Sequence, residues 1–313
     1  MRVLFFIPLL FLAACQKKEQ ETTQNSSPLD PSGTPLAHTA NILSFGPRPP
    51  ASAEIAKVRQ YVSTTLKNSG WSVGSQTFQS QTPLGQRTFT NLIARFPATP
   101  ETDPWKQTVE GILCAHLDSK YSPEKRFLGA DDAASACGLI LTLAAELAAE
   151  PEKASRMELV FFDAEEAFTE NMGPKANGIF DGIYGSRAYA ARWQAVKNKP
   201  TFGILLDMVG HKDLSIKIPS DSPSRLVDIM KEAAEETGHS KHFGMAAGPI
   251  LDDHVPLNQV GIPTIDLIGD FQSSDWWHTP KDNIDLISEE SLEITRQVVT
   301  VMIRELLLRS SPR

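Results

Sequence analysis

Four short apolar runs, separated by segments with helical patterns, constrain the fold of this chain more than any other feature. Apolar runs without polar alternation fill a sheet that is covered on both faces. Strands that alternate with helices predict a single α/β domain, with a mostly parallel central sheet flanked by helices. The expected strands are residues 111–118, 157–164, 202–210 and 262–269, and the expected helices are residues 133–149, 184–193, 222–237 and 288–308.

The composition is that of a globular protein large enough to build one core. The chain has 313 residues, of which 41% are hydrophobic and 22% are charged. The net charge of -8 argues against a nucleic-acid partner, because clustered positive charge holds such partners. No apolar run reaches the roughly 20 residues that a membrane-spanning helix needs.

The N-terminal residues are expected to precede the folded domain, which we place at residues 37–309. Arg2, an apolar run over residues 3–12 and two small residues are typical of a secretory signal peptide, here residues 1–14. Cys15 follows directly, and this arrangement resembles the lipobox of bacterial lipoproteins, in which the cysteine is lipidated. An ordinary signal peptide followed by an incidental cysteine is the alternative. Residues 15–36 are rich in Gln, Ser, Thr and Pro, which predicts a disordered tether.

A lipidated Cys15 would attach an exported chain to the lipid bilayer through an acyl anchor. Gln16, in place of an aspartate, suits the periplasmic side of an outer membrane. Export leaves the state of Cys114 and Cys137 open, since thiols can pair in an oxidising compartment and a free buried pair also fits the sequence. We expect the chain to be a monomer.

Potential metal ligands gather where the expected strands end. In an open α/β sheet, ligands bind outside the carboxyl ends of the strands. The residues concerned are His116, Asp118, Asp131, Asp132, Glu165, Glu166, Asp207 and His278. So many carboxylates would repel one another without a cation, and oxygen ligands with one or two imidazoles suit a catalytic Zn²⁺ that keeps an open position. The sequence therefore predicts a metal site.

The two adjacent glutamates are expected to have different roles. Neighbouring side chains on a strand point to opposite sides, so Glu165 and Glu166 cannot both reach one ion from a regular strand. One of them would bind the metal, and the other would be free to transfer protons.

Seven motifs, in order along the chain, resemble the animal-type glutaminyl cyclases of the zinc aminopeptidase family M28. They are HLDSKY (116–121), FLGADDAASAC (127–137), LVFFDAEEAF (159–168), YGSRAYA (184–190), LLDMVG (205–210), DDHVPL (252–257) and WHTPKDN (277–283). The resemblance covers most of residues 38–308 and implies the α/β fold of the zinc aminopeptidases. It also implies an enzyme that converts the N-terminal glutamine of a peptide or protein to pyroglutamate and releases ammonia.

The resemblance implies roles for single residues. Asp132, Glu166 and His278 would bind one zinc ion, which would polarise the γ-carboxamide carbonyl. Glu165 would be the general acid/base that moves a proton from the attacking amine to the leaving nitrogen. The other residues implied are Asp207 and Asp252, in a hydrogen-bond network with Glu165, and the pocket residues Phe271, Trp276 and Trp277.

A two-zinc aminopeptidase is the alternative that the same residues allow. His116 and Asp207 would then hold a second zinc ion, Asp132 would bridge both ions, and Glu165 would activate a water. Two features favour the cyclase: the long insert between EEAF (165–168) and YGSR (184–187), and the aromatic wall that Trp276 and Trp277 would form. A non-enzymatic binding protein on this scaffold is disfavoured, because neither a metal ligand nor Glu165 is lost.

Overall fold

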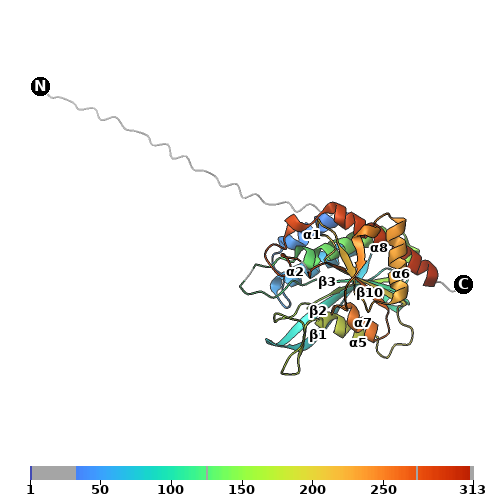
Figure 1. Ribbon diagram of the computed structural model, residues 1–313, viewed down its shortest axis with the longest axis horizontal. Coiled ribbons are helices and arrows are strands. Elements are labelled where there is room, and N and C mark those ends of the chain that lie inside the picture. The colour runs from blue at the N-terminus through green and yellow to red at the C-terminus, as the bar shows by residue number, and fades with distance from the viewer. Residues whose placement is uncertain (2–32, 125, 273, 311–313) are drawn as a thin grey trace.

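The computed structural model describes residues 1, 33–124, 126–272 and 274–310, and its centre is an eight-stranded sheet (Figure 1). The strand order is β1-β2-β4-β3-β7-β10-β8-β9. The strands are β1 (Ser72–Thr82), β2 (Gly85–Arg95), β3 (Gly111–His116), β4 (Met157–Phe162), β7 (Phe202–Asp207), β8 (Ile216–Ile218), β9 (Phe243–Met245) and β10 (Thr264–Gly269). The central pairs β4-β3, β3-β7 and β7-β10 are parallel, whereas β1-β2, β2-β4 and β10-β8 are antiparallel. The predicted α/β architecture with a mostly parallel centre is confirmed.

Helices cover both faces of the sheet. They are α1 (Pro35–Ser44), α2 (Ala53–Asn68), α3 (Ala136–Ala148), α4 (Pro151–Ala154), α5 (Tyr184–Ala191), α6 (Ser224–Glu236), α7 (His254–Gln259) and α8 (Glu289–Ser310). Figure 1 shows α1, α2 and α8 on one side of the sheet and α5 and α7 on the other. Alternation along β3 explains the two layers, because Leu113 and Ala115 join the cluster under α1, α2, α3, α6 and α8, while Ile112 and Cys114 join the one under α5 and α7.

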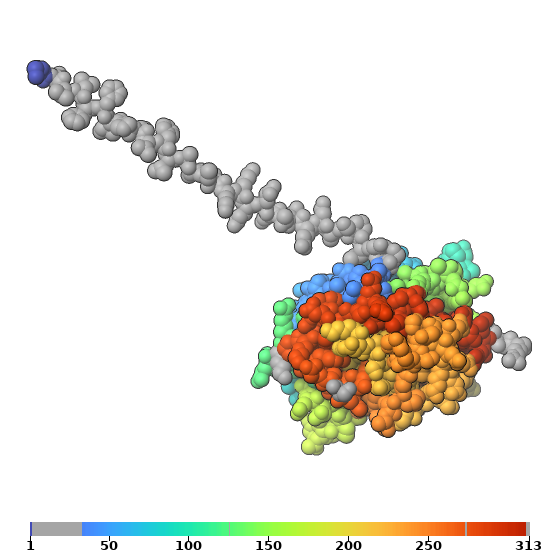
Figure 2. Space-filling model, turned by 45° about the horizontal axis from the view of Figure 1, so that its top comes forward, coloured from blue at the N-terminus to red at the C-terminus, as the bar shows by residue number. Residues whose placement is uncertain are grey.

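Shorter elements connect these layers. A two-stranded sheet joins β5 (Gly173–Pro174) to β6 (Phe180–Asp181). The short helices are the 3-10 helices η1 (Pro104–Lys106), η3 (Ser240–His242) and η4 (Ile284–Leu286) and the π-helix η2 (Ala130–Ser135). Figure 2 shows α8, in red, crossing one face of the molecule between blue α1 and orange α6. In the part of the chain that the structure describes, no helix is both long and apolar enough to cross a membrane.

The β1-β2 hairpin is not among the predicted strands. Every second residue of β1 from Ser75 to Gln81 is exposed to solvent. The sequence of the strand, SVGSQTFQSQT, is almost entirely polar. Because β1 has no apolar run, its sequence does not predict a strand. It is a strand because it pairs along its whole length with β2, which is more buried. The hairpin extends the sheet beyond the parallel strands.

The predicted elements are correct in type but differ at their ends. The strands expected at 111–118, 157–164 and 202–210 end at His116, Phe162 and Asp207. Ala164 and Met208 have φ of 60° and 52°, so the chain changes direction where the second and third of these strands end. The expected domain boundary at residue 37 lies inside α1, which begins at Pro35 after the N-cap Thr34. The signal peptide and Cys15 lie outside the described residues.

The structure settles the open question about the two cysteines, which are both free. Cys114 belongs to the cluster under α5 and α7, and Cys137 belongs to the cluster on the opposite face. The Cys137 thiol donates to the carbonyl of His116 over 3.0 Å. The sheet between the two thiols therefore prevents a disulfide.

Helix α1 lies unusually close to α3 at Gly138. A β-carbon at this position would lie 2.6 Å from the carbonyl oxygen of Pro35 and 2.6 Å from Oγ1 of Thr39. Thr39 is fully buried and its hydroxyl donates to the carbonyl of Pro35 over 2.8 Å. Only glycine permits this approach without displacement of α1.

We expect Gly138→Ala to lower the free energy of unfolding by about 1–3 kcal/mol, because the methyl group would push against the backbone of α1. Urea unfolding of the purified protein measures the change. Gly244→Ala is the matched control, since a β-carbon at Gly244 would meet nothing within 4 Å. Equal stability of the two variants would show that α1 accommodates the methyl group.

Candidate metal centre and active site

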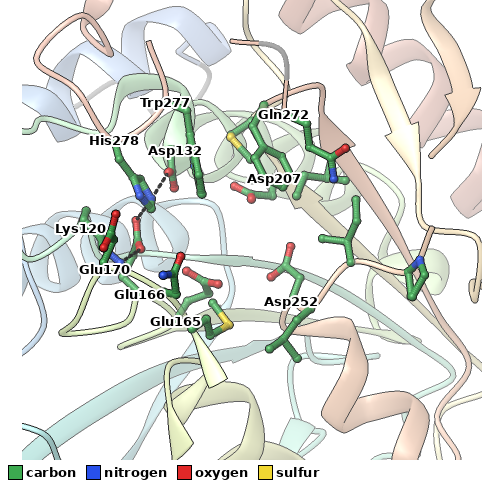
Figure 3. A pocket seen from close by; sticks show the side chains of 18 residues that line it. Lys120, Asp132, Glu165, Glu166, Glu170, Asp207, Asp252, Gln272, Trp277 and His278 are labelled. Carbon is green, nitrogen blue, oxygen red and sulfur yellow. Dashed lines mark ion pairs between the residues drawn. The ribbon is translucent and has the colours of Figure 1, made fainter. Parts of the chain in front are cut away.

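The predicted ligands meet at the carboxyl ends of the parallel strands. His116 and Asp207 are the last residues of β3 and β7, and Glu165 and Glu166 follow β4 after a short turn. Asp132 lies in η2, before α3, and His278 lies in the loop that precedes η4. Figure 3 shows Asp132, Glu166 and His278 facing one another at one side of the cavity, opposite Asp252. The sheet thus gathers residues that are up to 162 positions apart, from His116 to His278.

Asp132 occupies the centre of the cluster, with one oxygen toward each of two histidines. Its Oδ1 lies 3.1 Å from Nε2 of His116, and its Oδ2 lies 3.4 Å from Nε2 of His278. Nε2 of His278 is also 3.2 Å from Oε1 of Glu166, and Nε2 of His116 is 3.4 Å from Oδ1 of Asp207. Two groups of potential ligands therefore share Asp132: Asp132, Glu166 and His278, and His116, Asp132 and Asp207.

The donor atoms fit a divalent cation. Zinc ligands that lie about 2.0–2.1 Å from a tetrahedral ion are separated from one another by about 3.3 Å, which matches the distances around Asp132. Nε2 of His116, Oε1 of Glu166 and Oδ1 of Asp207 are buried without a hydrogen-bond partner among the described residues. Buried polar atoms that lack partners in a set of nitrogen and oxygen donors are what a bound cation would satisfy.

The electrostatics of the cluster also favour a cation. Burial alone would lower the pKa of His278, but Glu166 and Asp132 raise it to about 9. Burial opposes a charge on His116 as well, yet the carboxylates of Glu165, Asp118, Asp132 and Asp207 raise its pKa well above the ordinary range. Excess negative charge draws protons onto both imidazoles, and a metal ion would replace those protons.

Glu165 is set apart from the metal groups. It is 7% exposed and lines the cavity beside Glu166, with Asp207 and Asp252 around the same space (Figure 3). Burial, followed by the negative charges of Glu166, Asp252 and Asp253, raises the pKa of Glu165, while His116 lowers it. Burial likewise raises the pKa of Asp207, to about 8, and that of Asp252. The structure thus places Asp132, Glu165, Glu166, Asp207 and Asp252 around one cavity. The carboxylate of Asp131 does not line this cavity and accepts from the backbone N–H of Gly210 over 2.7 Å.

Two further buried aspartates hold the loops that carry the ligands. The carboxylate of Asp282 accepts from the backbone N–H groups of Asp131 and Asp132 over 2.7 and 3.2 Å. The carboxylate of Asp118 accepts in the same way from Glu165 and Glu166 over 3.1 and 3.2 Å. The supporting role of Asp282 was not predicted from the sequence, although it lies in the WHTPKDN motif, because a role played through backbone amides leaves no pattern in the ligands themselves.

A cavity of about 270 Å³ opens beside these residues. Phe271 and Trp277 line it, and their rings lie 4.7 Å apart. Trp277 also stacks on His278, with 3.9 Å between the ring centroids. Lys120 was not predicted, and its Nζ lies 3.3 Å from Oε2 of Glu166 at the cavity wall.

The prediction that Trp276 lines the same pocket is wrong. Its ring is buried against Met208 and Ile268 and stacks on His211 at 5.2 Å. The two adjacent tryptophans point to different places, since Trp277 lines the cavity and Trp276 does not. Only Trp277 therefore contributes to the wall of the cavity.

Comparison with known proteins places this geometry in a family. The model of peptidase family M28 matches residues 91–303. The glutaminyl-peptide cyclotransferase of Drosophila melanogaster is 30% identical over 80% of this chain and 75% of its own length. The chain therefore belongs to peptidase family M28 and, within it, to the glutaminyl-peptide cyclotransferases.

Solved structures agree with this placement. The glutaminyl cyclase of an Acidobacteriales bacterium has a TM-score of 0.76 and 28% identity, over 92% of this chain and 98% of that one. A Zn-dependent exopeptidase from Parabacteroides distasonis has a TM-score of 0.74 and 28% identity, over 87% of this chain and 97% of that one. The same fold therefore occurs in a cyclase and in an exopeptidase.

We expect Asp282→Ala to weaken the affinity for Zn²⁺ by about 10–100-fold, because the amides that fix Asp132 would lose their acceptor. Competition with a chromophoric chelator measures the affinity, and circular dichroism checks the fold. Asp285→Ala, three residues away and exposed, is the control and should bind Zn²⁺ like the unaltered chain. Unchanged affinity in a folded Asp282→Ala protein would contradict the supporting role.

Proposed function

We propose that this protein is a zinc-dependent glutaminyl-peptide cyclotransferase, which converts the N-terminal glutamine of peptides or proteins to pyroglutamate and releases ammonia. The observation that carries the proposal is the position of Glu165, a buried carboxyl group that faces the cavity and lies directly beside the metal ligand group. The cyclotransferase relatives support the same reaction.

Asp132, Glu166 and His278 would hold the zinc ion, since they offer one nitrogen and two carboxylates next to the cavity. When bound, zinc supplies a Lewis acid for the γ-carboxamide oxygen of the substrate. Asp282 and Asp118 keep the carboxylates of this group in place through the backbone. The ligands are therefore preorganised, which limits the cost of binding the ion.

Glu165 moves the proton. The substrate α-amine attacks the γ-carbonyl carbon, a C–N bond forms, and Glu165 takes one proton from the attacking nitrogen. The same carboxyl group then gives that proton to the departing γ-nitrogen, whose C–N bond breaks to release ammonia. The environment that raises the pKa of Glu165 makes it a stronger base for the first transfer. Asp252 contributes to that environment from across the cavity.

The shape of the cavity supports an intramolecular reaction. A volume of about 270 Å³ is small for a ligand site and suits a single residue better than a length of peptide. Trp277 and Phe271 would flank the aliphatic part of the glutamine and bring its amine close to its own carbonyl. Holding two groups of one molecule in this way supplies much of the acceleration in a cyclisation.

A two-zinc aminopeptidase is the second candidate, supported by the spacing of His116, Asp132 and Asp207. In that reaction Glu165 would take a proton from an attacking water instead of from the substrate amine. The Drosophila cyclotransferase and the Acidobacteriales cyclase do not favour this candidate. The product of the reaction separates the two.

Product analysis by mass spectrometry on the peptide Gln-Phe-Ala tests the proposal. We expect the peptide to lose the mass of one ammonia, with the peptide bonds intact, and we expect a chelator to abolish the reaction until Zn²⁺ is restored. Release of free glutamine would establish the aminopeptidase instead. Metal analysis of the purified protein gives the number of ions per chain.

Glu165→Gln should lower kcat by about 10²–10⁴-fold and leave the zinc content unchanged, because the amide cannot accept the proton. Glu166→Gln should lose zinc as well as activity, which separates the base from the ligand. Glu235→Gln, at an exposed position of α6, is the control for the change of charge. Loss of zinc in Glu165→Gln would place Glu165 in the metal shell.

We further propose that the protein is exported and attached to the outer membrane, on the periplasmic side, through lipidated Cys15. The apolar run before Cys15 and the polar tether after it support this location. Cys15→Ser should move the protein from the membrane fraction to the soluble fraction of the cell envelope, since the tether alone has little affinity for lipid. Retention of the variant in membranes would overturn the anchor.

A further inference from the structure

A fully buried aspartate occupies the interior of the central strand β10. Asp266 pairs with Leu205 of β7, and its side chain is 0% exposed. Its neighbours Ile265 and Leu267 belong to the cluster under α1, α2, α3, α6 and α8, so Asp266 faces the opposite layer, under α5 and α7. The cluster in that layer is apolar and includes Leu257 of α7. A carboxylate in such surroundings is costly unless hydrogen bonds or a positive charge compensate it.

Asp252 and His254 lie beside Asp266. His254 is the first residue of α7 and is buried, and its Nδ1 lies 3.5 Å from Oδ2 of Asp266. Asp252, just before α7, is also buried. Each of the three residues offers one ligand atom, and these atoms all lie within 4.8 Å of one another. This group shares no residue with the two groups around Asp132, and Figure 3 shows Asp252 across the cavity from Asp132.

The polar atoms of this group have no hydrogen-bond partner among the described residues. They are Oδ2 of Asp252, both ring nitrogens of His254 and both carboxylate oxygens of Asp266. Buried polar atoms nearly always have partners, so a group of them in one place indicates that something outside the protein chain satisfies them.

The charge of the group is not balanced by the protein. Among the residues that the structure describes, no lysine or arginine forms an ion pair with Asp252 or Asp266, and the basic group beside them is His254. Burial lowers the pKa of His254, so its imidazole is neutral at pH 7. The group therefore needs either protons or a cation. A divalent cation carries the charge that balances two carboxylates, so it would leave no net charge within the apolar layer.

The donor atoms favour zinc over other divalent cations. An imidazole nitrogen together with carboxylate oxygens suits Zn²⁺, whereas Ca²⁺ and Mg²⁺ are bound by oxygen atoms. Asp266 has two oxygens without partners, so three residues can supply the four donors of a tetrahedral ion. Asp252 also lines the active-site cavity, which gives an ion a path to the group.

We propose that Asp252, His254 and Asp266 bind a zinc ion, separate from any ion at Asp132. The ion joins the segment before α7 and the first turn of α7 to the central strand β10, and it fixes Asp252 in the wall of the active-site cavity. The inference goes beyond the proposed function and does not depend on it, because an ion in this position stabilises the same wall in a cyclotransferase and in an aminopeptidase.

The zinc content of two variants tests the inference. The proteins are loaded with Zn²⁺, desalted and analysed by mass spectrometry of the elements, and circular dichroism checks the fold. We expect His254→Asn and Asp266→Asn each to hold about one zinc ion per chain fewer than the unaltered protein. His242→Asn, which removes a half-buried imidazole from η3, and Asp228→Asn, at an exposed position of α6, are the matched controls and should keep the full zinc content.

A variant outside the group keeps the test decisive if His254→Asn or Asp266→Asn does not fold. Asp132 belongs to both of the other ligand groups, so Asp132→Ala should disable them together. We expect Asp132→Ala still to hold about one zinc ion per chain, and we expect the double variant with His254→Asn to hold none.

The outcomes that would overturn the inference do not involve the reaction. Equal zinc content in the unaltered protein and in folded Asp266→Asn would show that protons, and not a metal ion, neutralise the group. Absence of zinc from folded Asp132→Ala would show the same. The proposed function fails on a different measurement, the products formed from Gln-Phe-Ala, and its failure would leave the zinc content of these variants unchanged.

Discussion

The position of Asp132 is the constraint on which the rest of the site depends. Its two oxygens face two histidines that are brought together from β3 and from the loop before η4. A buried carboxylate is costly, and the pKa of Asp132 is held low by His116 and His278 against the effect of burial. The backbone N–H groups of Asp131 and Asp132 donate to the carboxylate of Asp282, and these bonds keep Asp132 between the two histidines. A cation beside either oxygen would complete the ligand group on that side.

The N-terminal helix contributes to the same support, although it precedes the region that matches the family model. Thr39 of α1 lies against η2, and its hydroxyl is 3.4 Å from the carbonyl of Ala134. Arg48 is fully buried and donates to the carbonyls of Leu117 and Gly129 over 2.7 and 3.0 Å. These contacts connect the chain before the sheet to the segment after His116 and to the segment before Asp132. The close approach of α1 at Gly138 therefore stabilises the segments that hold the site as well as the core.

Two cavities of different charge lie beside the metal group. Six carboxylates line the cavity around Glu165, whereas Lys217 and Asp270 are the charged residues among the described lining of the cavity beyond Phe271. The wall between them is made by residues that come after β10 and by the segment after β9.

The sequence by itself determined the kinds of residue at the site and the edge where they would meet. Apolar runs fix the buried strands, and a parallel sheet brings their carboxyl ends together, so His116, Asp132, Glu165, Glu166, Asp207 and His278 could be nominated from spacing alone. Only the tertiary structure decided which neighbours face the cavity. Trp276 and Trp277 are adjacent, yet Trp277 lines the cavity and the ring of Trp276 is buried against Met208 and Ile268. It also decided that Cys114 and Cys137 stay apart and that Asp282 supports Asp132, because both depend on distances through space that no local pattern encodes.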